Sequence, residues 1–308
     1  MEPGGYAWWY VDALSDDGRY GLTIIGFIGS VFSPYYARAR RVAGDAAADP
    51  LNHCAINVAL YGGARGAQRW AMTERGRSGV FRSASTLRIG TSALRWDGDA
   101  LVIQLDEIAA PIPSRIRGEV RVHPLALVNQ DFALDAAGRH RWRPIAPFAW
   151  VEVALSRPSL HWSGTGYLDS NGGSRPLEQD LTEWDWSRAA LADGRTAVIY
   201  DVARRDAGKQ CLAVQFDASG AAEPFEAPGE APLGRTGWRM DRSTRCDAGG
   251  TARVLRNLED APFYARSVIE SQLAGQRATS VHEHLSLDRF TTRWCQWMLP
   301  FRMPRKAS

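Results

Sequence analysis

Residues 101–108 read LVIQLDEI, in which the odd positions up to Leu105 are apolar while Gln104 and Asp106 are polar. Residues 115–122, RIRGEVRV, show the same period of two. Because successive side chains of a β-strand point to opposite faces, this period predicts strands with one face on a core and the other in water.

Similar stretches recur along the chain, rich in β-branched and aromatic residues and bounded by Gly, Pro, Asp or Asn. Turn signals follow one another about every ten residues, as antiparallel barrels and sandwiches require. Helical periodicity is scarce; residues 180–191 fit a short helix or a strand, and 289–298 fit a short helix. The sequence therefore predicts an all-β protein, with strands at 20–28, 54–61, 100–108, 116–123, 149–155, 160–167, 196–202, 210–216, 252–258, 267–273 and 279–287.

A length of 308 residues favours two domains. The polar, proline-containing stretch at 135–147 separates two strand-rich halves, so we expect domains at residues 1–143 and 144–308. No residue-level repeat relates the halves. A barrel of about eight strands can hold one apolar ligand, which makes an enclosed hydrophobic site compatible with this fold.

Composition excludes several classes of function. A net charge of +3 is too small to indicate a nucleic-acid-binding protein. No signal peptide and no apolar run long enough to span a bilayer is evident. The basic tail from Arg302 to Lys306 could touch an anionic membrane, although a frayed, solvated end is favoured. The cysteines lack the spacing of a zinc site and are expected to be inert thiols: Cys54, Cys211, Cys246 and Cys295.

Two pairs of residues offer chemistry. Tyr167 and Asp169 lie two apart in a glycine-rich segment, so on a strand they share a face and can handle a proton together. The spacing alone favours a strand end, with Asp169 bonding the amides of a turn. His140 and Trp142 are also two apart, among arginines; such a His is usually solvated, whereas an exposed Trp would need an explanation.

Two other patterns are weaker. The carboxylates near Asp169 suggest a glycosidase pair, but their spacing is unspecific: Glu178, Asp180, Glu183 and Asp185. His282 and His284 would share a face of a strand, as two metal ligands can, yet no third ligand is evident and cross-strand surface packing is favoured. No nucleotide-binding glycine motif and no GxSxG elbow occurs.

Three long motifs carry a resemblance to a known family: PGGYAWWYVDA at residues 3–13, GFIGSVFSPYY at 26–36 and GTGYLDSNGG at 164–173. The chain resembles the carotenoid 1,2-hydratases, or hydroxyneurosporene synthases, of photosynthetic bacteria, over nearly its whole length. The resemblance implies two lipocalin-like β-barrel domains and cofactor-free, metal-free hydration of the C1,2 double bond of neurosporene or lycopene. It implies catalytic roles for His140, Trp142, Tyr167 and Asp169.

Alkene hydration begins with proton transfer to C2, which leaves a tertiary cation at C1 for water to attack. An ordinary aspartic acid is almost wholly ionised at pH 7, so we expect burial to raise the pKa of Asp169 and keep it protonated. Tyr167 would orient Asp169 or share its proton, and Trp142 would face the cation. His140 would position or deprotonate the water, or re-protonate Asp169.

Two alternatives stay open: a non-catalytic lipocalin-like carrier of an apolar polyene, and a cofactor-free cyclase of the same fold. Because the substrate is insoluble in water, we expect peripheral contact with the cytoplasmic side of the photosynthetic membrane. The site is expected where the two domains meet. The sequence predicts no oligomeric state.

Overall fold

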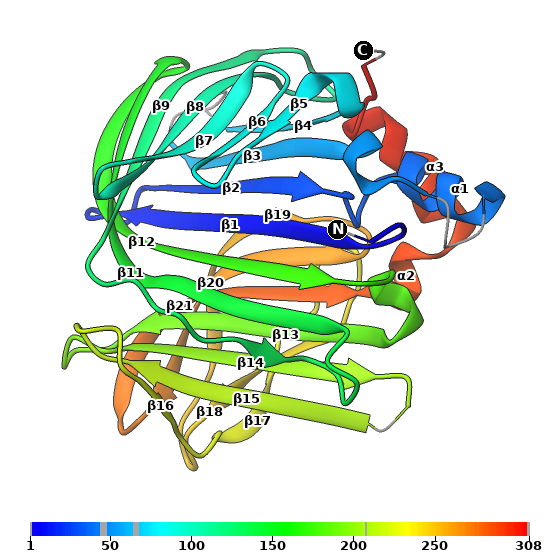
Figure 1. Ribbon diagram of the computed structural model, residues 1–308. Helices are drawn as coiled ribbons and strands as arrows, with labels where there is room; N and C mark the ends of the chain where they lie inside the picture. The colour runs from blue at the N-terminus through cyan, green and yellow to red at the C-terminus, as the bar shows by residue number, and fades with distance from the viewer. Residues whose placement is uncertain (1, 44–47, 64–67, 207, 307–308) are drawn as a thin grey trace. The chain divides into compact units, whose positions relative to one another are not determined.

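The computed structural model describes residues 2–43, 48–63, 68–206 and 208–306, most of which lie in strands (Figure 1). The chain forms two compact units, Met1–Pro176 with Gln296–Ser308, and Leu177–Cys295. The division therefore follows Pro176, whereas the boundary expected at 143/144 falls inside one long strand, His140–Arg157. The polar side chains of that stretch occupy one face of a strand, which explains why they resemble a linker in the sequence.

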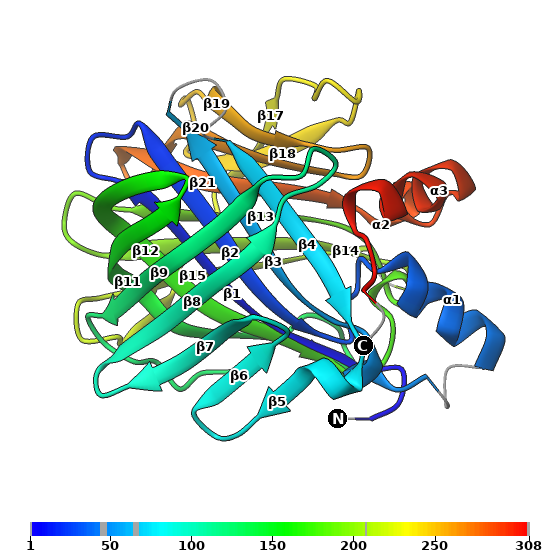
Figure 2. The same ribbon diagram turned by 90° about the horizontal axis from the view of Figure 1, so that it is seen from above.

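The first unit contains one antiparallel twelve-stranded sheet in the order β4-β3-β2-β1-β12-β11-β9-β8-β7-β6-β5, with β10 beside β11. Figure 2 shows β8, β7, β6 and β5 following one another along the near side. The backbone N–H of Ala110 donates to the carbonyl oxygen of Trp70, which joins the β4 edge to the segment after β8 and curls the sheet toward a barrel. Its strands are β1 (Tyr6–Ser15), β2 (Tyr20–Ile28), β3 (Cys54–Gly62), β4 (Arg69–Arg75), β5 (Val80–Arg82), β6 (Thr86–Ile89), β7 (Ser92–Asp97), β8 (Ala100–Ile108), β9 (Arg115–Pro124), β10 (Phe132–Ala133), β11 (His140–Arg157) and β12 (Ser159–Gly173), and helix α1 is Pro34–Ala43.

One face of this sheet carries the hydrophobic core, to which Val11 of β1 and Leu168 of β12 belong. Their neighbours along the strands, among them Tyr10, Tyr167 and Asp169, point to the opposite face and are also buried. The strands around the site are therefore buried on both faces, apolar on one and aromatic with carboxyl groups on the other.

The second unit contains a seven-stranded antiparallel sheet, β16-β15-β14-β13-β21-β20-β19, and a two-stranded sheet, β17-β18. Residues 180–191, for which the sequence allowed a helix or a strand, form mostly strand β13, whereas the helix expected near 289–298 is present as α2 and α3. The elements of this unit are β13 (Leu181–Ala190), β14 (Thr196–Arg204), β15 (Gly208–Phe216), β16 (Ala222–Pro224), β17 (Gly229–Leu233), β18 (Arg242–Cys246), β19 (Arg253–Asp260), β20 (Tyr264–Leu273), β21 (Gln276–Ser286) and α2 (Leu287–Phe290). Helix α3 (Arg293–Arg302) begins in this unit and ends in the first. The predicted all-β class is confirmed.

Candidate active site

Trp142, Tyr167 and Asp169 meet on the face of the first unit's sheet that is opposite its core. Trp142 belongs to β11, and Tyr167 and Asp169 belong to β12, its antiparallel neighbour. The indole Nε1 of Trp142 donates to Oδ2 of Asp169 at 2.8 Å, and the Tyr167 hydroxyl donates to the same oxygen at 2.9 Å. All three side chains are buried, so the turn interpretation of Asp169 is wrong.

His140 lies farther along the same face. Its partner on β12 is Gly173, four residues beyond Asp169, which corresponds to roughly 13 Å between Cα positions along the strand. Its Nδ1 shares a hydrogen bond of 2.9 Å with the Tyr6 hydroxyl, and the two rings stack. His140 is fully buried, so the solvated-surface interpretation is wrong.

Gly173 makes the close packing of His140 possible. A Cβ added at residue 173 would lie 2.8 Å from Nδ1 of His140 and 2.5 Å from the Tyr6 ring. Any larger residue would push the two rings apart. At Gly173 the glycine-rich segment therefore allows close approach of the two rings.

Two residues of β1 that the sequence did not single out, Tyr10 and Asp12, also belong to this face. The strand register pairs Tyr10 with Asp169 and Asp12 with Tyr167. The Tyr10 hydroxyl donates to Oδ2 of Asp12 at 2.8 Å, and Asp12 is buried. The signal was present in the sequence, because Tyr10-Val11-Asp12 repeats the pattern Tyr-aliphatic-Asp of residues 167–169.

The phenol of Tyr167 is held in its neutral form. Burial raises the pKa of Tyr167 well above its ordinary value, and the negative charge of Asp169 and the hydrogen bond to it act in the same direction. Trp142 opposes this shift, and the charge of Asp12 adds to it. Tyr167 is therefore a hydrogen-bond donor to Asp169 at any working pH.

Aromatic rings surround these polar groups. Trp142 stacks on Phe132 at 5.1 Å between ring centroids. Tyr6 stacks on Trp8 at 5.1 Å, and Trp8 meets Phe27 at 6.1 Å. Such faces pack against apolar ligands and stabilise cations.

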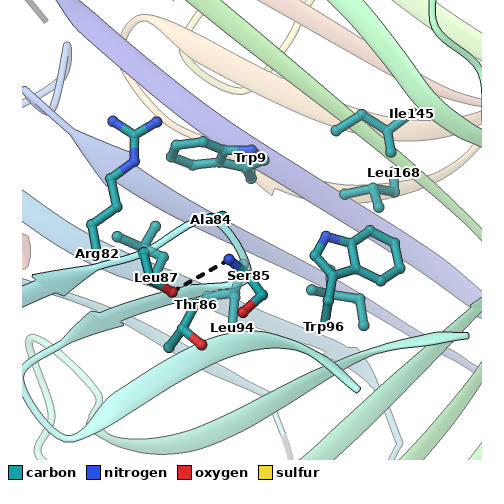
Figure 3. A pocket seen from close by; sticks show the side chains of 12 residues that line it. Trp9, Arg82, Ala84, Ser85, Thr86, Leu87, Leu94, Trp96, Ile145 and Leu168 are labelled. Atoms are coloured by element: carbon teal, nitrogen blue, oxygen red, sulfur yellow. Dashed lines mark hydrogen bonds between the residues drawn. The ribbon is translucent and has the colours of Figure 1, made fainter. Parts of the chain in front are cut away.

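A cavity of about 170 Å³ lies on the other face of the sheet, where Trp9 and Leu168 point (Figure 3). The Arg82 guanidinium lies over the Trp9 ring at 5.5 Å from its centroid. The cavity is smaller than the roughly 300–1,000 Å³ of ordinary ligand pockets. Since Leu168 points away from Tyr167 and Asp169, this cavity does not adjoin the acid.

The second unit holds the residues for which the sequence suggested metal binding or glycosidase chemistry. His282 and His284 share a face of β21 and both contact Oδ1 of Asp185, at 3.5 and 2.9 Å. All three side chains lie in the interior, so surface packing of the histidines is wrong. Burial disfavours ionised Asp185, but its hydrogen bonds to the two histidines outweigh this and lower its pKa to about 2. Among the described residues no group of His, Cys, Asp or Glu suits a metal ion.

A family model and three related sequences show to which family the chain is similar. The family model described as "Carotenoid hydratase CrtC" matches residues 24–308. The acyclic carotenoid 1,2-hydratase of Thiocapsa roseopersicina is 58% identical over 306 residues, covering 99% of this chain and 74% of the relative. That of Rubrivivax gelatinosus is 53% identical, covering 100% and 75%, and that of Cereibacter sphaeroides is 39% identical, covering 92% and 98%.

Solved structures resemble the fold at low sequence identity. A Nitrosomonas europaea protein assigned as AttH aligns with a TM-score of 0.63 at 16% identity, covering 91% of this chain and 92% of its own. Kievitone hydratase from Nectria haematococca aligns with a TM-score of 0.52 at 8% identity, covering 92% and 90%. These two likenesses confirm the lipocalin-like fold alone. Because the family model and the relatives span nearly the whole sequence, the chain belongs to the carotenoid hydratase family.

Proposed function

We propose that this protein hydrates the C1,2 double bond of acyclic carotenoids such as neurosporene and lycopene, with Asp169 as the acid. The observation that carries the proposal is the buried carboxyl of Asp169, whose Oδ2 accepts hydrogen bonds from both Trp142 and Tyr167. Three relatives named acyclic carotenoid 1,2-hydratase support the reaction and the substrate class.

In the first step, Asp169 transfers its proton to C2, the π electrons form the new C–H bond, and C1 becomes a tertiary cation. A carboxyl among buried aromatic rings favours its neutral form before the transfer. The two donors on Oδ2 then stabilise the carboxylate that remains. The arrangement is thus complementary to the charge that develops during proton transfer.

In the second step, the cation is stabilised until water attacks C1. The indole of Trp142, which stacks on Phe132, lies within hydrogen-bond distance of the acid. An aromatic face stabilises a desolvated cation by about 2 kcal/mol. Water adds its oxygen to C1 and gives up one proton, so the substrate is neither oxidised nor reduced. We therefore propose that the reaction needs neither a cofactor nor a metal.

The same fold could serve a carrier or a cyclase, and labelled water distinguishes them. Purified protein is incubated with detergent-solubilised lycopene in H₂¹⁸O without added cofactor, and the products are analysed by mass spectrometry. A hydratase gives 1-hydroxy product carrying ¹⁸O. Unchanged lycopene would indicate a carrier, and an unlabelled isomer would indicate a cyclase; either result contradicts the proposal.

We further propose that the protein works in peripheral contact with the cytoplasmic side of the photosynthetic membrane, where its apolar substrate is dissolved. Among the described residues, no helix is both long and apolar enough to cross a bilayer. Peripheral contact through exposed apolar side chains would give access to the substrate. Flotation of the purified protein with lipid vesicles tests this, and a protein that stays at the bottom of the gradient contradicts it.

A further inference from the structure

Helix α3 exposes an apolar stripe. Trp294, Trp297, Met298 and Phe301 are 45%, 83%, 44% and 74% exposed. Their spacing of three and four residues places them on one side of the helix. A helix side that faces water normally carries polar residues. This stripe therefore indicates that an apolar partner covers the side chains.

The opposite side of α3 and the chain after it are firmly held. Leu299 and Met303 are buried. The backbone of residues 304–306 then bonds to β4, where Glu74 donates to the carbonyl of Pro304 at 2.9 Å and accepts from Lys306 at 3.1 Å. The Arg305 guanidinium pairs with the buried carboxylate of Glu74. The tail is therefore not a frayed end, and α3 presents its stripe from a fixed position.

We propose that α3 docks the protein on an anionic lipid bilayer, with Trp297 and Phe301 at the boundary between headgroups and acyl chains. The segment 293–306 contains four basic residues and no acidic one. Arg305 is paired with Glu74, and Arg302 lies over the Trp70 ring. The exposed cations beside the stripe are therefore Arg293 and Lys306. Aromatic side chains flanked by cations are the combination that binds the membrane interface. This inference rests on the proposed function, because it supplies the surface through which a carotenoid would be taken from the membrane.

Vesicle binding tests the docking surface. The double variant Trp297→Ser with Phe301→Ser is compared with Ile112→Ser, which removes an equally exposed apolar side chain outside α3. In co-sedimentation with phosphatidylcholine vesicles containing phosphatidylglycerol, we expect the double variant to bind about tenfold more weakly or worse. The control and the wild type should bind alike, and both should bind less to pure phosphatidylcholine.

Activity on detergent-solubilised lycopene separates this inference from the proposed function. The double variant should hydrate detergent-solubilised lycopene at the wild-type rate, because its substituted residues are exposed and outside the site. Unchanged vesicle binding by the double variant, or no binding of wild type to any vesicle, would overturn the docking surface. Loss of hydration by all forms would instead contradict the proposed function.

A second, independent observation concerns Asp12. The sequences Tyr10-Val11-Asp12 and Tyr167-Leu168-Asp169 lie on adjacent antiparallel strands, β1 and β12. In each, the tyrosine hydroxyl donates to the carboxylate two residues later, at 2.8 and 2.9 Å. Because the register sets each tyrosine opposite the aspartate of the other strand, the two carboxyls and two phenols form one buried group.

We infer that Asp12 is the base that completes the hydration begun by Asp169. Asp169 gives its proton to C2, and the carboxylate of Asp12 accepts the proton released when water bonds to C1. Tyr167 then passes its hydroxyl proton to Asp169 and takes one from Asp12, which restores the starting state with one water consumed.

Asp12 suits this role better than His140, which the sequence suggested. Asp12 is directly opposite Tyr167, the residue that bonds Asp169. His140 is paired with Gly173, four residues away from Asp169, and its Nδ1 bonds Tyr6. The path for proton transfer to Asp169 is therefore shorter from Asp12 than from His140.

Substitution of Asp12 tests this role. The groups that face Asp12 are Tyr10 on its own strand, Tyr167 and Asp169 on β12, and Thr23 on β2. Asp12→Asn removes the proton acceptor and should lower kcat on the order of a hundredfold. Asp12→Glu, which keeps a carboxyl group, should retain more activity.

Tyr10→Phe is the matched control, since it removes the hydrogen bond to Asp12 but keeps the carboxyl; it should keep most of the wild-type kcat. An Asp12→Asn variant with wild-type kcat, or an Asp12→Glu variant no more active than Asp12→Asn, would overturn the role of Asp12. If Asp169→Asn is also fully active, the proposed function itself fails.

Discussion

The indole nitrogen of Trp142 lies 2.8 Å from Oδ2 of Asp169, across the β11–β12 strand pair. This contact joins the two residue pairs that the sequence offers separately. It gives Trp142 two functions at once, as a donor to the carboxylate and as an aromatic face beside it.

Substitutions at Trp142 separate these two functions. Trp142→Phe keeps an aromatic face and removes the donor, so kcat should fall about tenfold to a hundredfold, as for loss of a hydrogen bond to a charged group. Trp142→Leu also removes the face and should lose a further factor of about ten. The check is kcat on solubilised lycopene; equal activity of the Phe and Leu variants would show that the ring face contributes nothing to the reaction.

The phenol of Tyr167 predicts how stability changes in alkali. Its pKa is raised in the folded protein, mainly by burial, so its contribution is present below the ordinary tyrosine value of about 10 and is lost as pH rises above it. Wild type should therefore lose more stability than Tyr167→Phe between about pH 9 and 11. Urea unfolding across this range measures the difference; parallel curves for the two proteins would contradict the argument.

Gly173→Ala should disturb the site without touching the acid. The added Cβ would meet His140 and Tyr6 at 2.8 and 2.5 Å, and such crowding costs about 1–3 kcal/mol. Gly172→Ala is the matched control, because its nearest heavy atom would be at 3.6 Å, an ordinary contact. In chemical denaturation, Gly173→Ala should have a clearly lower free energy of unfolding than Gly172→Ala. Equal free energies would mean that the His140 and Tyr6 rings adjust freely.

Asp185 predicts acid sensitivity of the second unit. Its pKa is lowered from 3.8 to about 2, so its stabilising contribution, on the order of 2 kcal/mol, is present above pH 4 and lost as pH falls through 2. Asp185→Asn should lack this part of the acid dependence. Asp99→Asn, an exposed position, serves as the control. The free energy of unfolding, measured between pH 5 and 2, checks this prediction. If it changes with pH equally in wild type and Asp185→Asn, the prediction is contradicted.

Most of the strands could be predicted because they depend on short sequence spacings. At residues 164–173 the spacing alone favoured a turn, and only the resemblance to a family pointed to Tyr167 and Asp169 as site residues. The domain boundary could not be predicted, because Arg141 and Arg143 form ion pairs with Asp131 on one side of β11 while His140 and Trp142 are buried on the other. A strand of this kind has the composition of a linker.

Asp12 was missed for a different reason. Its partner Tyr167 is 155 residues away in the sequence, and only the pairing of β1 with β12 brings the two together. The motif itself was visible, but strand register between distant segments depends on the whole sheet and not on local pattern.

The central claim is that Asp169 is the acid. Asp169→Asn keeps the size of the side chain and can accept at its oxygen from Trp142 and Tyr167, but it has no proton to give to C2. The most direct measurement is kcat of this folded variant on lycopene in H₂¹⁸O. We predict at least a thousandfold loss of labelled 1-hydroxy product; labelled product at the wild-type rate would contradict the account.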